Sequence, residues 1–344
     1  MQILKGIGLL VFVLSLFSLF SLKAPKGQKA MNGLANAAVA TFLVEAVHRY
    51  ISGSFLNIKF LQEVGSISGD MGGVAAVILV SINMGIKPAY AVIAGVAVGG
   101  YGIIPGFIAG YIIGLIGPIL EKKLPEGLDI ILGAIILAPL ARIIALGVDP
   151  IVNLTLLNIG NVISITAEQS PYIMGFCLGG IMKIICTSPL SAMALTAMLG
   201  LKGLAMGIAS IACIGGAFSD GMVIKKLKLG NLTNVIGVIL EPLTQADIVT
   251  TNPVPIYCSN FFAGGIAGIA AAYFNIINNA PGTAAPIPGL LVPFAFNEPK
   301  NVLFAVLIGI LGGVTCGFIG STIFDKIKFN LFKQKENSKK LQVQ

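Results

Sequence analysis

The sequence predicts an all-α polytopic membrane protein, and three observations support this fold class. Of the 344 residues, 56% are hydrophobic and only 10% are charged, whereas soluble domains carry about 25% charged residues. No charge interrupts residues 88–120, 248–297 or 301–324, and a membrane helix needs about 20 apolar residues. These runs lack the period-two alternation of a membrane β-barrel. A bundle of helices is therefore the expected architecture, because lipid cannot form hydrogen bonds with unpaired backbone groups.

We expect about ten apolar segments to enter or cross the membrane, some of them broken or re-entrant. They are predicted at residues 4–22, 31–50, 71–86, 89–118, 128–147, 172–187, 190–220, 233–247, 256–275 and 302–324. The Gly-rich run 94–116 is expected to form two packed pieces with a turn at 101–106.

One transmembrane domain is predicted over residues 1–329. Within it, residues 1–29 add an N-terminal helix and a basic loop to a core of residues 30–324. Three lysines follow the first apolar run where a signal peptide would be cleaved, so this run is expected to stay as a membrane helix. Residues 330–344 are expected to form a basic cytoplasmic tail.

The net charge of +8 fits membrane topology better than nucleic-acid binding. The lysines gather in short connecting segments and at the C-terminal end, at Lys23, Lys26 and Lys29, at Lys122 and Lys123, at Lys225, Lys226 and Lys228, and at six positions from Lys326 to Lys340. This is the pattern of cytoplasmic loops under the positive-inside rule. It forms no basic stripe with interleaved aromatics. The lipid bilayer of the cytoplasmic membrane is thus an expected partner, and nucleic acid is not.

The cysteines and the histidine predict neither a cofactor nor a metal site. All five cysteines lie in apolar stretches without metal-ligand spacing, which is typical of small buried side chains. The only histidine, His48, lies in a predicted membrane segment. Phosphoryl transfer needs a soluble domain with a reactive His or Cys. The chain is therefore not expected to be an enzyme by itself.

Three stretches carry more Asn, Thr and Pro than a plain membrane helix: residues 153–169, 241–260 and 275–299. Proline and asparagine at this density are expected to prevent a continuous helix. Irregular backbone at membrane depth occurs only where protein or a watery cavity surrounds it. Such broken elements indicate a transporter's binding site. For residues 275–299, an ordinary external loop is an equal alternative.

Glu241 is the strongest candidate for a solute-binding residue. It ends an apolar segment, and an ionisable side chain at membrane depth is costly enough to indicate a function. Pro242 can break the helix there, which leaves free backbone groups beside a carboxylate that together bind hydroxyls. Gln245, Thr250 and Thr251 are expected in the same re-entrant element. The alternative is a loop glutamate at the membrane surface.

Other polar residues in apolar surroundings have weaker assignments. Thr187 and Ser188 are predicted at the tip of a broken helix that faces the solute. Lys183 lies four residues earlier, and the alternative for it is that its long side chain extends the charge to the membrane surface. Asp70 and Asp220 are expected at helix ends in loops.

Residues 237–268 resemble the substrate-site region of enzyme IIC, the membrane permease of the sugar phosphotransferase system. They read GVILEPLTQADIVTTNPVPIYCSNFFAGGIAG. A short Gly-x-x-Glu motif of that family supplies a sugar-binding glutamate, and Glu241 is in the similar position with one extra residue before it. Asn252 and Pro253 stand where fructose-type members have Asp-Pro. Residues 87–116, 153–198 and 280–293 also resemble family segments in the same order.

Two departures from the family pattern are visible. Residues 187–192 read TSPLSA in place of Gly-Gly-Pro-Val-Asn-Lys, and residues 281–284 read PGTA without the family's His. The chain is therefore similar to a divergent branch that contains the perfringolysin regulator, and its hexose specificity is in doubt.

The resemblance implies a homodimeric permease with a scaffold and a substrate-binding domain. Its solute would be a sugar, a polyol or a sugar-like acid, carried by alternating access, and any IIA and IIB phosphotransfer proteins would be separate chains. On the resemblance, the amides Asn158 and Asn161 are further candidates for lining the site, against interhelix hydrogen bonding as the alternative. A second function stays open, namely a permease-derived sensor that regulates gene expression without transport.

Overall fold

The described part of the chain, residues 2–123, 129–188 and 191–341, is mainly helical and contains no strand in the computed structural model. Within these residues, seven helices are long and apolar enough to cross a membrane, or eight if the bent pair Lys59–Asp70 and Gly72–Asn83 is one span. Two shorter apolar helical stretches, Pro171–Thr187 and Pro286–Ala295, add to them. The chain is an all-α polytopic membrane protein, as the sequence predicts.

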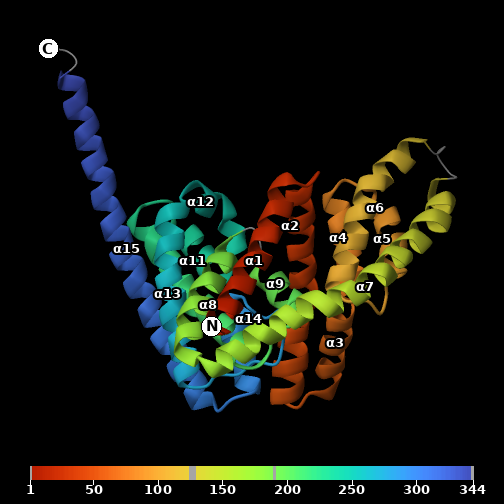
Figure 1. Cartoon of the computed structure of the whole chain (residues 1–344), viewed down its shortest axis with the longest axis horizontal. Coiled ribbons are helices and arrows are strands. Elements are labelled where there is room, and N and C mark those ends of the chain that lie inside the picture. Colours follow the sequence, from red (N-terminus) through yellow and green to blue (C-terminus); the bar gives the residue numbers. More distant parts are fainter. Residues whose placement is uncertain (1, 124–128, 189–190, 342–344) are drawn as a thin grey trace.

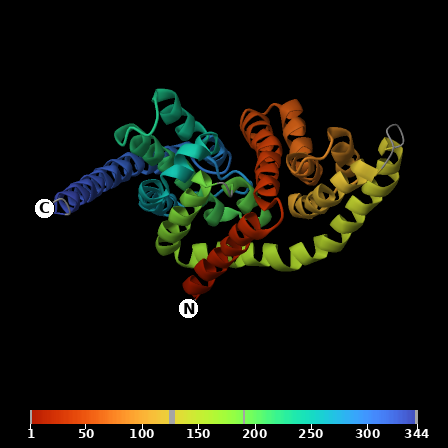
Figure 2. The same cartoon turned by 90° about the horizontal axis from the view of Figure 1, so that it is seen from above.

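The N-terminal third of the chain forms one lobe, at the right of Figure 1. Its α4 packs on α2, α5 and α6, whereas α1 crosses between the two lobes (Figure 2) and contacts both α2 and α8. The elements are α1 (Gln2–Lys23), α2 (Gly27–Ala38), the π-helical turns η1 (Val39–Leu43) and η2 (Ala46–Phe55), α3 (Lys59–Asp70), α4 (Gly72–Asn83), α5 (Pro88–Val96) and α6 (Ile103–Lys123). The predicted division of residues 94–116 into two pieces is confirmed, since α5 and α6 are separate helices.

The C-terminal half forms a second lobe, in which α8, α10, α13 and α15 pack on one another (Figure 1). Its elements are α8 (Pro171–Thr187), α9 (Ala192–Met198), α10 (Gly203–Lys226), α11 (Leu232–Leu240), η3 (Pro242–Gln245), α12 (Ala246–Thr251), α13 (Pro253–Tyr273), α14 (Pro286–Leu291), η4 (Val292–Ala295) and α15 (Pro299–Leu341). Many of these helices begin with proline, which lacks an N–H that the first turn would leave unpaired.

Glycines allow the helices of this lobe to approach closely. An added Cβ on Gly175 of α8 would lie 2.7 Å from the carbonyl oxygen of Gly268 in α13, and one on Gly264 of α13 would lie 2.5 Å from the Lys183 Cβ of α8. Small residues at such contacts are typical of helix packing in lipid. The lobe core contains mainly Ala, Leu, Ile and Met side chains from α8, α10, α13 and α15.

The two lobes are bridged by α7 (Asp129–Gln169), a single helix of 41 residues. At 1.5 Å per residue it is about 60 Å long, which is twice the hydrocarbon thickness of about 30 Å. It runs diagonally in Figure 1 and as an arc in Figure 2. The arc contains Pro139 and Pro150, and a proline inside a helix is a usual cause of bending.

Two sequence-based expectations about helix continuity are wrong. Residues 153–169 are not broken but belong to α7, because polar side chains there bond back to their own helix: Asn158 Nδ2 donates to the Leu154 carbonyl at 2.8 Å. The predicted segment 190–220 is not one piece; α9 ends at Met198 and α10 begins at Gly203, and the turn between them uses positive φ angles at Gly200 and Gly203.

The proline-rich stretch 275–299 is folded into the protein and is not an external loop. Asn278 is fully buried, and its Nδ2 donates to Ser210 Oγ at 2.8 Å and to Thr283 Oγ1 at 2.9 Å. Residues 282–286 are all buried as well. The stretch contacts α10 of its own lobe and η2 of the other lobe, so it contributes to the contact between the lobes.

Candidate functional site

Glu241 lies at the helix break between α11 and η3. Helix α11 begins with reciprocal hydrogen bonds between Asn231 and Asn234, a capping arrangement that satisfies backbone donors. It ends at Glu241, whose backbone is extended (φ −149°, ψ 97°) and which precedes Pro242. The Glu241 side chain is half-buried, and its Oε1 accepts from the Leu243 amide at 3.4 Å. The predicted helix break at Glu241 and Pro242 is therefore confirmed.

The segment after Glu241 folds back as two short helical pieces before α13 begins. Gln245 Oε1 accepts from Asn234 Nδ2 at 2.7 Å, which ties the segment to α11. The hydroxyls of Thr250 and Thr251 are exposed and donate to carbonyls of their own helix at 2.8 Å. Asn252 Nδ2 donates to the Ile248 carbonyl at 3.1 Å. Each hydroxyl oxygen can still accept a hydrogen bond from a solute.

A second helix end approaches this segment. Thr187 ends α8, is fully buried, and donates from its Oγ1 to the Lys183 carbonyl at 2.8 Å. Ser188 Oγ donates to the Ile185 carbonyl at 2.9 Å. Contacts join α8 to η3, so the structure brings the helix that carries Thr187 against the element that begins after Glu241.

The candidates on α7 are placed differently. Asn158 and Asn161 lie at exposed positions of that helix. They belong neither to the Glu241 segment nor to the end of α8. Their role as solute ligands stays a prediction.

A buried polar network adjoins this region, and sequence reasoning did not identify it. Lys183 Nζ lies 2.6 Å from Asp220 Oδ2, and both side chains are fully buried. Asp220 Oδ1 accepts from Asn260 Nδ2 at 2.7 Å, and the same amide lies 2.9 Å from Thr187 Oγ1. One ion pair and one amide thus link α8, α10 and α13.

The expected position of Asp220 is therefore wrong. The alternative for Lys183, extension to the membrane surface, does not hold either, because its ammonium has a carboxylate partner inside the lobe. Asp220 is not at a helix end but within α10. The fold leaves room for the lysine stem: an added Cβ on Gly216 would lie 2.7 Å from Lys183 Cε. The sequence did contain a signal, since charges of opposite sign in two apolar segments are expected to pair inside a membrane protein.

The electrostatics of the region follow from these contacts. Asp220 neutralises Lys183 within the lobe, while Glu241 is half-buried and has no cation at hydrogen-bond distance among the described residues. Glu241 is thus a carboxylate at a helix break whose oxygens can accept further hydrogen bonds. Recognition of hydroxyl groups requires such acceptors.

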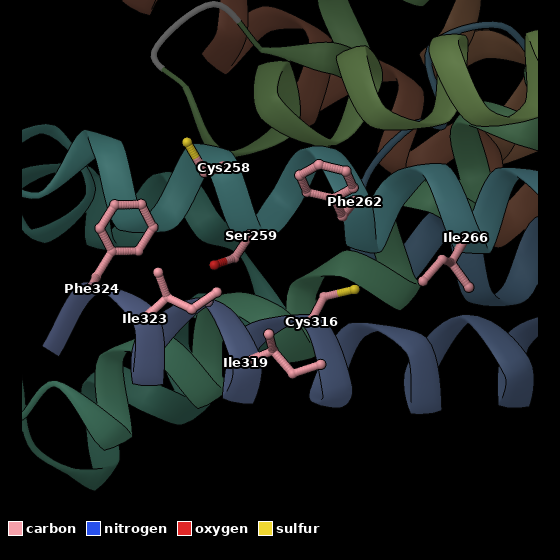
Figure 3. A pocket seen from close by; sticks show the side chains of 9 residues that line it. Cys258, Ser259, Phe262, Ile266, Cys316, Ile319, Ile323 and Phe324 are labelled. Carbon is pink, nitrogen blue, oxygen red and sulfur yellow. The ribbon is translucent and has the colours of Figure 1, made fainter. Parts of the chain in front are cut away.

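The polar region does not coincide with the more open grooves of the protein. A groove of about 410 Å³ lies between α13 and α15, lined by side chains such as Phe262, Ile319 and Ile323 (Figure 3). Its lining is almost entirely apolar, so it does not suit a polar solute. No group of three or more possible metal ligands occurs within the described ranges.

Comparison with known proteins gives a family match over most of the chain. A family model described as "Phosphotransferase system, EIIC" matches residues 28–336, which contain both lobes and the Glu241 segment. No curated protein matches, and no solved structure matches.

Proposed function

The chain belongs to the phosphotransferase system EIIC family, and on that premise we propose that Glu241 binds a small polar solute which the protein carries across the membrane. EIIC domains are membrane components of sugar transport rather than catalytic enzymes. The proposed solute is a sugar, a polyol or a sugar-like acid. The placement of Glu241 carries the proposal: it is a half-buried carboxylate at a helix break, directly before the element η3 that packs on α8.

The surrounding residues have distinct roles in this proposal. The Glu241 carboxylate accepts from solute hydroxyls, a charge-assisted bond stronger than a neutral one. Gln245, Thr250, Thr251 and Asn252 supply amide and hydroxyl groups on the same segment. Thr187 and Ser188 lie at the end of α8, where helix-terminal backbone groups are available to a solute. Pro242 is buried and keeps the break in place.

Movement of one lobe against the other is the proposed transport step. The lobe of α8–α15 carries Glu241, and the lobe of α2–α6 would act as the scaffold. Alternating access in membrane transporters commonly uses such rigid-body motion around a fixed site. We propose further that the protein is a homodimer, and that any IIA and IIB phosphotransfer proteins are separate chains.

The test is binding and uptake by the purified chain in vesicles. Glucose, fructose, mannitol, glucitol and gluconate serve as probes, with thermal stabilisation as the binding signal, since a ligand of the folded state raises stability. Glu241→Gln should abolish the stabilisation by any active probe. Glu63→Gln, which changes an exposed glutamate on α3, is the matched control and should retain it. Undiminished binding by Glu241→Gln would refute the site.

Uptake separates transport from sensing. Saturable uptake of a radiolabelled probe that also stabilises the protein supports the permease. Binding without uptake, in vesicles of either orientation and with or without an added phosphorylating extract, would favour the solute-sensing regulator instead.

A further inference from the structure

The apolar groove between α13 and α15 has the shape and position of a lipid site. It is lined by Cys258, Ser259, Phe262 and Ile266 of α13 and by Cys316, Ile319, Gly320, Ile323 and Phe324 of α15 (Figure 3). The two helices approach at its floor, where Gly320 faces Ser259. Both helices are long and apolar enough to span a membrane. Phe262, Ile319 and Ile323 are each more than half exposed, so the groove opens outward from the bundle.

The length of the groove matches one leaflet. On α15 it extends from residue 316 to residue 324, which is about 12 Å at 1.5 Å per residue. Half of a hydrocarbon core of about 30 Å is about 15 Å. The groove ends at Phe324, the last residue of the uncharged run 301–324, and Asp325 and Lys326 follow it. A hydrocarbon chain in the groove would thus lie in the leaflet on the Lys326 side.

Basic side chains lie at this end of the groove. Lys326 is exposed and falls on the helix face of Ile319 and Ile323, because residues spaced by four and then three lie on one side of a helix. The C-terminal end of α10 packs on the same part of α15: Lys226 Nζ lies 3.3 Å from the Phe318 ring centroid and contacts Thr322.

The local charge at this end is positive. Lys225 and Lys228, at the end of α10, are exposed as well. Asp325 is exposed beside Lys326. Among the described side chains at the C-terminal end of α10 and the neighbouring part of α15, Lys225, Lys226, Lys228 and Lys326 outnumber this one carboxylate.

From this combination we propose that the groove binds the acyl chain of an anionic phospholipid, with Lys326 contacting the headgroup phosphate. An apolar groove in a membrane span takes a hydrocarbon chain of any lipid. Selection for the anionic headgroup comes from the lysine, because juxtamembrane lysines attract anionic lipids electrostatically. The proposal is independent of the solute assigned to Glu241.

The test uses the absence of tryptophan from the chain. Ile319→Trp places a single indole in the groove, and Leu311→Trp places one on an exposed part of α15 outside it. Each full-length variant is reconstituted into vesicles that contain an increasing mole fraction of phosphatidylglycerol or of phosphatidylcholine with brominated acyl chains, over the same range for both lipids. We expect phosphatidylglycerol to quench the Ile319→Trp indole at an about fivefold lower mole fraction, as expected for one lysine near an anionic lipid. The Leu311→Trp indole should be quenched equally by both.

Two lysine variants assign the headgroup contact. In the Ile319→Trp background, Lys326→Gln should remove the preference for phosphatidylglycerol. Lys300→Gln, at the other end of the same helix and 6.0 Å from the Phe304 ring centroid, should retain it. Equal quenching by both lipids in the parent variant, or an unchanged preference in Lys326→Gln, would overturn the proposal.

A second copy of the chain is the competing occupant. Cys258 is exposed in the groove, so a copy seated there would bring cysteines of two chains together. Efficient oxidative cross-linking between chains through Cys258 in phosphatidylglycerol vesicles, lost in Cys258→Ser, would likewise overturn the lipid assignment.

Discussion

Replacing Lys183 by methionine is expected to destabilise the protein by about 3–5 kcal/mol, the usual cost of leaving one buried charge without its partner. The structure sets this expectation, because Lys183 and Asp220 are both fully buried and lie 2.6 Å apart. Asp220→Asn should cost a similar amount, since it leaves the lysine ammonium in an apolar interior.

A double variant separates the effect of removing the whole ion pair from the effect of leaving one buried charge unpaired. Lys183→Met with Asp220→Leu removes both charges, and replacing a whole buried ion pair by apolar groups is often neutral or stabilising by about 1–4 kcal/mol. We expect the double variant to be more stable than either single variant. The double variant should still lose some stability relative to the wild type, because Asn260 Nδ2 would lose its hydrogen bond to Asp220. A lost bond of this kind costs about 1–3 kcal/mol.

The measurement is the free energy of unfolding of the purified full chain in mixed micelles titrated with SDS. Arg49→Met is the comparison, because it breaks an ion pair of similar length, 2.7 Å, that is less buried, with the Arg49 side chain 39% and the Glu45 side chain 14% exposed. It should cost less than Lys183→Met, because contact with water lowers the cost of an unpaired charge. A loss of under about 1 kcal/mol in both Lys183→Met and Asp220→Asn would refute the buried, paired arrangement, since only accessible pairs behave so.

Three further outcomes test the packing. Asn278→Ala should destabilise the protein by about 1–3 kcal/mol, as expected when buried polar partners lose a bond, and should speed hydrogen exchange in residues 275–285. Gly268→Leu should abolish the monodisperse peak on size exclusion, because its side chain would meet the backbone of α8, whereas Gly147→Leu on α7 meets open space and should retain that peak. In micelles, maleimide should label Cys258, which is exposed, and label Cys213, which is buried, only after denaturation; equal labelling of both would contradict the packing of α10.

Much of the fold was predictable from local chemistry. Apolar runs identified the membrane helices, because composition decides whether a segment is stable in lipid. The break after residue 240 was predictable as well, since Pro242 limits the helix whatever lies around it. By contrast, residues 153–169 were expected to be irregular, yet their amides and hydroxyls bond within α7. Sequence shows that such side chains are polar, but not whether they bond to their own helix or elsewhere.

The sequence alone determined the class of protein and the position of Glu241 at a helix break. Only the tertiary structure decided which helix faces meet. Lys183 and Asp220 are 37 positions apart, and their pairing depends on the rotation of α8 and α10 and on the space left by Gly216. The same packing buries residues 282–286 and leaves the α13–α15 groove open. Local composition fixes where a helix can form, whereas its partners depend on contacts between distant residues, because each face is buried only when a complementary face covers it.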